Sequence, residues 1–286
     1  MNVRKNKWSE ELMQAVFLLC ACVSIAAVVL ICVFIFSGGA PAFAEIGVFR
    51  FLFGTEWNPS ADKFGILPMI ISSIYVTAGA VLIGVPVALL CALFMARFCP
   101  PNLYKILKPA VNLLAGIPSI VYGFFGLTVI VPLMQSLFGG SGKSVLTASV
   151  ILGIMILPTV IGVAETAIRA VPEQYFEGAL ALGATRERSV FTVVFPAAKS
   201  GVTAGVILGV GRAIGETMAV VMVAGNPRVI PGSILDGART LTANVVLEMS
   251  YATDLHREAL IATAAVLFVF ILAINISFSL LKRKES

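Results

Sequence analysis

Between two long apolar runs, the chain reads Val171-Pro172-Glu173-Gln174-Tyr175-Phe176-Glu177-Gly178-Ala179-Leu180-Ala181-Leu182-Gly183-Ala184-Thr185-Arg186. Pro172 suits the first turn of a helix, and Glu173 is favourable beside the positive end of the helix dipole. Gly183 is typical of a residue that ends a helix. The stretch therefore predicts a short amphipathic helix of about ten residues. Such a helix either lies on the lipid surface or, because Gly178 and Ala179 are small, lets a partner protein approach closely.

The rest of the chain is apolar enough for a membrane. Of its 286 residues, 59% are hydrophobic and only 12% are charged, whereas soluble domains average about 25% charged. A transmembrane helix needs about 20 consecutive apolar residues. Six runs approach or exceed that length, so we predict an all-α membrane protein with six transmembrane helices, kinked where Pro118, Pro132 and Pro158 fall; the runs are 15–37, 68–96, 109–135, 145–166, 202–225 and 259–281.

The basic residues predict the orientation of these helices. The formal net charge is +5, and the bases gather at the ends of apolar runs, which indicates membrane topology rather than nucleic-acid binding. Most of the 20 Lys and Arg fall on one side if both termini are cytoplasmic. The expected organisation is an N-terminus, first helix and external loop in 1–67, a core in 68–281 with a cytoplasmic loop at 167–200, and a cytoplasmic tail at 282–286.

Residues 15–36 are longer than the h-region of a signal peptide, about 7–15 residues, so we expect an uncleaved first helix. The external loop 38–67 holds Phe49, Phe51, Phe53 and Trp57, which predict an aromatic belt at the membrane interface or a docking surface. The second long external loop is 226–258.

Several motifs are not expected to bind a ligand or to form a reactive site. The stretch Gly139-Gly140-Ser141-Gly142-Lys143-Ser144 resembles a phosphate-binding loop, but the full pattern needs glycine where Leu137 stands. We interpret it as a turn, so the chain has no nucleotide site of its own. His256, the only histidine, is expected at the surface, and the five cysteines are expected to be small apolar residues rather than disulfides or metal ligands.

The fifth apolar run contains Arg212 and Glu216, which share one face if the helix is continuous. A charge near mid-membrane costs about 2.5–3.5 kcal/mol, so the pair needs a reason. Either it fixes helix packing, or Arg212 faces a pathway and attracts an anion while Glu216 limits how tightly the anion is held. Thr217 follows directly. Nearby glycines predict close helix contacts; they are Gly201, Gly205, Gly209, Gly211 and Gly215.

The segment 177–196 resembles the cytoplasmic loop of ABC importer permeases, whose pattern is E-A-A-x3-G-x9-I-x-L-P. Glu177, Gly178, Ala179 and Gly183 match its first part, with Gly in place of the second-position Ala; Val193, Phe195 and Pro196 match the rest, with Val for Ile and Phe for Leu. In that family the loop forms the coupling helix that sits in a cleft of the ATPase subunit. The resemblance implies coupling roles for Glu177, Gly178, Ala179, Gly183 and Arg186.

Within this family, the chain is similar to the permease subunits of phosphate importers from about residue 64 to residue 275. The similarity is carried by Gly211–Val220, by 115–123 and 154–159, and by Asn226. It implies the type I ABC importer (MetI-like) fold, in which the first helix wraps the side of a five-helix core in the bacterial inner membrane.

The same resemblance implies the partners. They are a homologous second permease, two ATPase subunits that bind ATP and Mg, and an external phosphate-binding protein. This chain would hold no cofactor, bind no nucleic acid and catalyse no reaction. Two alternatives stay open. One is a permease for sulfate, molybdate or tungstate. The other is a transporter driven by an ion gradient, with Arg212 and Glu216 in a proton relay.

Overall fold

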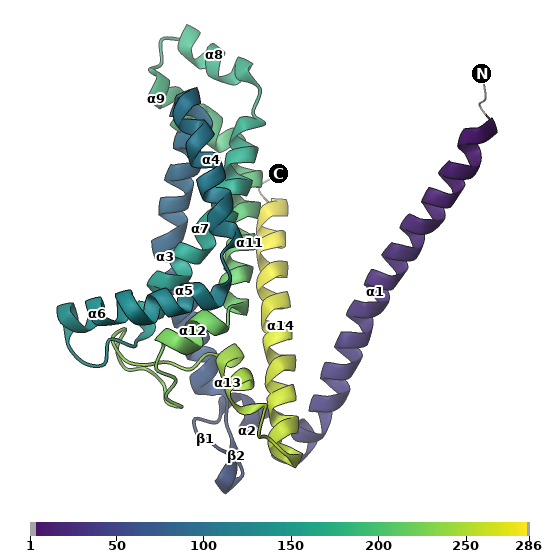
Figure 1. Cartoon of the computed structure of the whole chain (residues 1–286), viewed down its shortest axis with the longest axis vertical. Helices are drawn as coiled ribbons and strands as arrows, with labels where there is room; N and C mark the ends of the chain where they lie inside the picture. The colour runs from purple at the N-terminus through teal and green to yellow at the C-terminus, as the bar shows by residue number, and fades with distance from the viewer. Residues whose placement is uncertain (1–3, 285–286) are drawn as a thin grey trace.

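The computed structural model describes the backbone of residues 4–284 and the side chains of residues 10–277. Residues 1–3 and 285–286 lie outside the described part, and so do the side chains of the basic residues expected at the two ends; these are Arg4, Lys5, Lys7, Lys282, Arg283 and Lys284. The described part is helical apart from loops and one small hairpin (Figure 1). The hairpin pairs β1 (Trp57–Asn58) with β2 (Lys63–Phe64) in antiparallel fashion.

The helices, in chain order, are α1 (Arg4–Ile46), α2 (Val48–Phe53), α3 (Leu67–Leu93), α4 (Pro101–Gly116), α5 (Ser119–Phe125), α6 (Val131–Phe138), α7 (Val145–Arg169), α8 (Glu173–Ala181), α9 (Arg186–Ser189), α10 (Phe195–Ala197), α11 (Lys199–Gly215), α12 (Met218–Val223), α13 (Leu241–Glu248) and α14 (Asp254–Lys284). A 3-10 turn, η1, spans Pro59–Ala61, and three wider π-helical turns are η2 (Phe94–Phe98), η3 (Gly126–Ile130) and η4 (Val190–Val194).

Within the described residues, five helices are long and apolar enough to cross a membrane, and a sixth span arises if one bent pair counts as one. That pair joins Arg186–Ala197 to Lys199–Gly215 with a bend of 72°. The six-helix membrane architecture is therefore confirmed. The N-terminal end of α1 and the C-terminal end of α14 point toward the end of the molecule that carries α8 (Figure 1).

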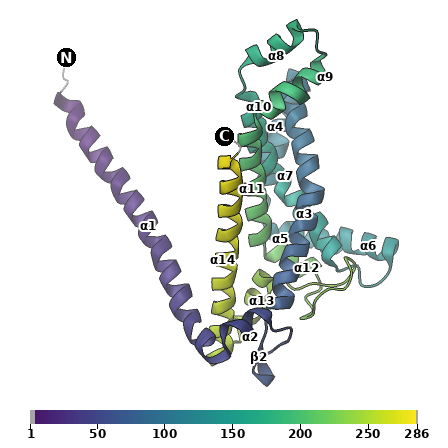
Figure 2. The ribbon, with the colours of Figure 1, turned by 180° about the vertical axis from the view of Figure 1, so that it is seen from behind.

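Helices α3, α7 and α11 form the centre of the bundle (Figure 2). Glycines allow the close approach of α11 to α7. A Cβ added to Gly201 would lie 2.4 Å from the Cβ of Ala167, and one added to Gly209 would lie 2.6 Å from Val160. The predicted packing role is confirmed for these glycines. Among the described residues, a Cβ added to Gly211 or Gly215 would meet nothing within 4 Å, so this side of α11 is open in the described part of the chain.

The third apolar run is broken. Helix α4 ends at Gly116, Ile117 and Pro118 are extended, and α5 starts at Ser119. Pro118 supplies the break because its ring cannot continue the preceding helix. In Figure 1, α5 and α6 run across the bundle, whereas α4 runs along it.

The fifth apolar run is also broken, which corrects one expectation. Helix α11 ends at Gly215, and Glu216 is extended with φ −70° and ψ 134°. A second short helix, α12, begins at Met218. Arg212 and Glu216 therefore do not share a continuous helix face, and the assumption of an i, i+4 pair was wrong.

Helix α1 diverges from the rest of the chain (Figures 1 and 2). None of its most apolar 18-residue window is buried, and its packing on α14 is concentrated near its C-terminal end, where Gly39 contacts Ala262. The resemblance implied a first helix wrapped along the side of the core, but this helix leaves the core instead. Its apolar surface faces outward, which suits lipid or another membrane subunit.

The loop after α1 contains another correction. Phe51 and Trp57 are buried, at 0% and 3% exposure, in a cluster with Phe64 and Leu260. These two aromatic residues form a small core at the end of the bundle opposite α8 instead of an interfacial belt. Phe49 and Phe53 are exposed and stack on each other with ring centroids 6.3 Å apart, so for these two residues an interfacial belt or a docking surface stays a prediction.

The glycine-rich stretch that resembles a phosphate-binding loop forms a turn between α6 and α7, as predicted. Gly139, Gly140 and Gly142 all have positive φ, a conformation that suits glycine. Ser144 then caps α7 by accepting a hydrogen bond from the Thr147 N–H at 3.2 Å.

Candidate functional site

Helix α8 occupies the far tip of the molecule, beyond the ends of the long helices (Figure 1). It spans Glu173–Ala181 and contains no buried residue. Gly183 follows it with φ +85°, and the Gly183 and Ala184 N–H groups return to the carbonyl oxygens of Leu180 and Ala179. The predicted short helix and its glycine stop are confirmed.

The first end of α8 is held by Arg97, which comes from η2 after α3. Its guanidinium pairs with Glu173 and donates to the carbonyl oxygens of Ile168 at 3.2 Å and Val171 at 3.0 Å. The Arg97 side chain is only 11% exposed. A planar guanidinium with several donors suits this task, since it satisfies one carbonyl in the last turn of α7, one just after α7, and the first acidic residue of α8 together.

The second end of the segment returns to the same turn. Arg186 donates to the Arg97 carbonyl oxygen at 2.7 Å and lies over the Phe98 ring, 5.6 Å from its centroid. Thr185 caps α9 by accepting from the Arg188 N–H. Arg186, expected among the coupling residues, is thus directed inward onto η2, whereas Glu177, Gly178 and Ala179 remain on the outer helix.

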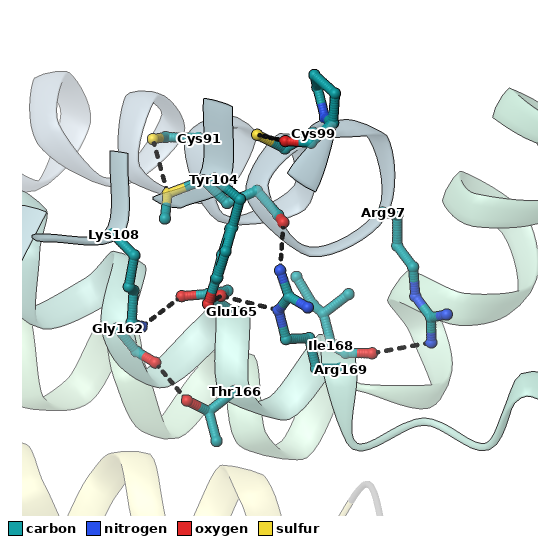
Figure 3. Close-up of polar contacts among 12 residues, drawn as sticks. Cys91, Arg97, Cys99, Tyr104, Lys108, Gly162, Glu165, Thr166, Ile168 and Arg169 are labelled. Carbon is teal, nitrogen blue, oxygen red and sulfur yellow. Dashed lines mark hydrogen bonds and ion pairs between the residues drawn. The ribbon is translucent and has the colours of Figure 1, made fainter. Parts of the chain in front are cut away.

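A buried carboxylate lies directly beneath this turn (Figure 3). Glu165 of α7 is 1% exposed. One oxygen accepts from Tyr104 at 2.7 Å and from Arg169 at 2.8 Å, and the other pairs with Lys108 at 2.6 Å. Arg169 also donates to the carbonyl oxygen of Met95 at 2.7 Å and lies 4.2 Å above the Tyr104 ring. Tyr104, Lys108, Glu165 and Arg169 are called the Glu165 network below.

This network was not predicted from the sequence, although one signal for it is present. Glu165 is a carboxylate at the end of an apolar run, with Arg169 four residues later on the same helix. Its other two partners come from α4, 57 and 61 residues away in sequence, and no local pattern indicates them.

The predicted pathway residues lie at the break between α11 and α12. Arg212 is half-buried and donates to the Thr159 hydroxyl of α7 at 3.3 Å. Glu216 accepts from the Ala219 N–H at 3.3 Å, and its own carbonyl accepts from Thr242 at 3.1 Å. Within the part of the chain that the structure describes, Arg212 and Glu216 form no ion pair with each other.

Thr217 is half-buried in the same break, and its hydroxyl donates to the Gly215 carbonyl oxygen at 3.3 Å. The break therefore places one guanidinium and one carboxylate on separate supports, beside the open side of α11 at Gly211 and Gly215. A guanidinium without a carboxylate partner among the described residues retains donors for an anion.

A second buried carboxylate, Glu248, lies at the other end of the bundle. Its side chain is 1% exposed. One oxygen pairs with Arg239 at 2.6 Å and Arg228 at 2.8 Å; the other accepts from the Trp57 indole at 2.9 Å and lies 2.9 Å from His256. The expectation that His256 is a surface residue was wrong, because its side chain is 14% exposed and packed beside Trp57.

Two opposing effects set the pKa of Glu248. Burial raises it, but the hydrogen bonds from Trp57, Arg239 and His256 and the charge of Arg228 lower it, and the net pKa lies below the ordinary value. Glu248 is therefore ionised at neutral pH and joins the β-hairpin, the loop before α13, and α14 into one unit.

The chain matches the family model described as "Binding-protein-dependent transport system inner membrane component" over residues 84–286. It belongs to this family. Within the family, it is 40% identical over 284 residues to "Probable ABC transporter permease protein YqgH" of Bacillus subtilis, with 95% of this chain and 92% of the relative covered. It is 37% identical to "Phosphate transport system permease protein PstC" of Mesorhizobium japonicum, with 82% of this chain and 78% of the relative covered.

Solved structures agree on the family fold. The inward-facing MetNI methionine ABC transporter matches with a TM-score of 0.65 and 17% identity, covering 81% of this chain and 100% of that chain. A bacterial alginate ABC transporter in complex with a pentasaccharide-bound periplasmic protein matches with a TM-score of 0.66 and 15% identity, covering 98% and 96%. The chain is thus a multi-pass membrane permease subunit of an ABC importer with the type I, MetI-like fold, and a transport component rather than an enzyme.

Proposed function

We propose that this chain is a permease subunit of an ATP-driven phosphate importer and forms half of the translocation pathway. The observation that carries the proposal is the similarity to several phosphate transport permeases, at 37% identity over 87% of this chain for the relative from Xylella fastidiosa strain Temecula1. The half-buried, positively charged Arg212 at the helix break supports an anionic substrate, since a guanidinium binds phosphate oxygens through paired donors.

In this proposal α8 is the coupling helix. Two cytoplasmic ATPase subunits bind ATP and Mg, and one of them receives the outer face of α8 at Glu177, Gly178 and Ala179. Support comes from the lack of any buried residue in α8 and from the exposure of Leu182, at 91%, just beyond it. Gly183 ends the helix, and Arg186 holds the returning chain. The side of the membrane that carries α8 is then the cytoplasm, and both termini lie there.

A homologous second permease completes the pathway by packing on the open side of α11. An external phosphate-binding protein delivers phosphate at the opposite end of the bundle. Arg212 attracts the anion, while Glu216 and Thr217 at the break limit how tightly it is held. Closure of the ATPase pair on ATP moves α8 and switches the access of this site from one side of the membrane to the other.

The experiment is uptake of labelled phosphate by a strain that carries the chain with its neighbouring subunits, against a matched strain that lacks the chain. We expect uptake that excess unlabelled phosphate abolishes and that sulfate, molybdate and tungstate leave unchanged. If one of those three oxyanions competes and phosphate does not, that oxyanion is the substrate in place of phosphate. Uptake that stops when the ion gradient is dissipated but ATP is kept would contradict ATP-driven transport.

A further inference from the structure

We propose that Glu165 is a positioning residue that couples movement of α8 to movement of α4. The proposal rests on the proposed coupling role of α8. Glu165 itself does not form the expected ATPase contact, because it is buried inside the permease and 1% exposed.

One turn of the chain, η2, holds both α8 and the Glu165 network. Arg97 and Met95 both belong to η2. Arg97 binds the start of α8 through Glu173, and the Met95 carbonyl oxygen accepts from Arg169 of the network. Figure 3 shows Arg97, Arg169 and Glu165 following one another along this end of the bundle. A displacement of α8 therefore acts on η2 and on Arg169 together.

The Glu165 network is a principal specific attachment of α4. Val111 is the one buried residue of α4, and Tyr104 and Leu107 pack partly buried beside it, so the apolar contacts of this helix are few. Tyr104 and Lys108 lie four residues apart on α4 and both bind the Glu165 carboxylate. Directional bonds to a buried charge fix the rotation and height of a helix more strictly than a few apolar contacts.

Helix α5 connects α4 to the break between α11 and α12. Helix α4 continues through Ile117 and Pro118 into α5. Gly123 of α5 lies against Ala219 of α12, where an added Cβ would be 2.9 Å from the Ala219 Cα. Helix α12 directly follows Glu216 and Thr217. The described elements thus form a contiguous series from α8, through the Glu165 network and α5, to the proposed substrate residues.

The test uses the whole complex reconstituted in proteoliposomes, with uptake of labelled phosphate and ATP hydrolysis measured on the same sample. Glu165→Gln removes the charge and keeps the size of the side chain. We expect the number of phosphate ions transported per ATP to fall roughly tenfold, with ATP hydrolysis retained. Thr166→Val is the matched control, because Thr166 is exposed and, among the described residues, its hydroxyl bonds only to Gly162 of its own helix; it should leave the ratio unchanged.

A second variant separates coupling from folding. Glu165→Gln alone leaves Lys108 without its charge partner and is expected to lower the thermal stability, whereas Glu165→Gln with Lys108→Met removes both charges and should recover part of it. If transport per ATP remains low in the double variant while stability recovers, the positioning role is supported. If transport per ATP follows stability, or if Glu165→Gln matches the wild type, the proposal is overturned. Wild-type proteoliposomes that take up no phosphate would instead contradict the proposed substrate.

Discussion

At the scale of single residues, the broken helix changes what Arg212 and Glu216 are expected to do. Arg212 contacts Thr159, and Glu216 contacts the first turn of α12. Two charges on separate supports do not neutralise each other as an i, i+4 pair would. The explanation in which they serve only as a packing pair therefore loses its geometric basis.

This geometry predicts the outcome of a paired substitution. Arg212→Gln should lower phosphate uptake by about tenfold, because a hydrogen bond to a charged group is worth about 1.5–3 kcal/mol, while the complex still assembles. Adding Glu216→Gln should not restore uptake. The measurement is labelled phosphate uptake with co-purification of the ATPase as the assembly control. Restoration to the wild-type rate in the double variant would show that the two charges do act as a pair.

Glu248 supports a second prediction at this scale. Glu248→Gln should lower stability by about 3 kcal/mol, because Arg228 and Arg239 lose a buried countercharge. The folded-state pKa of Glu248 lies below its ordinary value of 4.5, so its stabilisation is complete above that value and is lost as pH falls through the lowered pKa.

Thermal unfolding of wild type and Glu248→Gln in detergent checks both parts. The two melting temperatures should differ clearly at pH 7 and converge as pH falls below about 4.5. Glu56→Gln is a suitable control, because Glu56 pairs with Lys63 at the surface, where both side chains are more than half exposed; it should change stability little. A gap between wild type and Glu248→Gln that widens on acidification would contradict the assigned charge state.

At the scale of elements, Arg97 and Arg186 hold the two ends of the α8 segment, whereas the outer face of α8 is exposed. A Cβ added to Gly178 would meet nothing within 4 Å in the part of the chain that the structure describes. Its small size therefore has no role in the packing of the permease itself. The room around Gly178 is available to a partner.

Gly178→Leu should consequently block ATPase binding while leaving the chain folded, and Gly178→Ala should bind and transport as the wild type does. The measurement is co-purification of the ATPase with the tagged chain, together with the melting temperature of the chain. The alanine variant is the matched control, since it restores the residue that is usual in the family pattern. Equal recovery of ATPase with the leucine variant would place the contact elsewhere on the loop.

Elements that depend on local chemistry could be predicted from sequence. Helix α8 was predicted because the residues that favour its start and its end, Pro172 and Gly183, are both local to the same short segment. The break at Glu216 was not, because the apolar run is continuous and the carbonyl freed by the break is satisfied by Thr242, 26 residues later. The surroundings of Phe51, Trp57 and His256 were missed for the same reason, since their partners are distant in sequence.

At the scale of the whole molecule, the distribution of basic residues and the fold agree that the two ends of the chain are directed to the same side as α8. The N-terminal end of α1 and the C-terminal end of α14 both point toward the end of the molecule that carries α8, although α1 stands away from the bundle (Figure 1). The hairpin of β1 and β2, which contains Trp57, occupies the opposite end (Figure 2).

Single cysteines in a cysteine-free background test the proposed orientation. Leu182→Cys, at a position that is 91% exposed, should react with a membrane-impermeant thiol reagent only in inside-out vesicles. Ser60→Cys, at the hairpin turn, should react only in right-side-out vesicles. The same reagent applied after detergent should label both variants equally. The reverse pattern would invert the membrane assignment of α8.

The residues that bind Glu165 are synthesised in a fixed order. Lys108 and Tyr104 leave the ribosome before Glu165, being 57 and 61 residues earlier in the chain, and Arg169 follows only four residues later. When α7 reaches the lipid, α4 has already been made and its ammonium and phenol groups are available. A buried carboxylate is costly to insert alone, and Lys108, its countercharge from α4, is already synthesised when α7 is made, so the sequence order of the network favours correct biosynthesis as well as the finished structure.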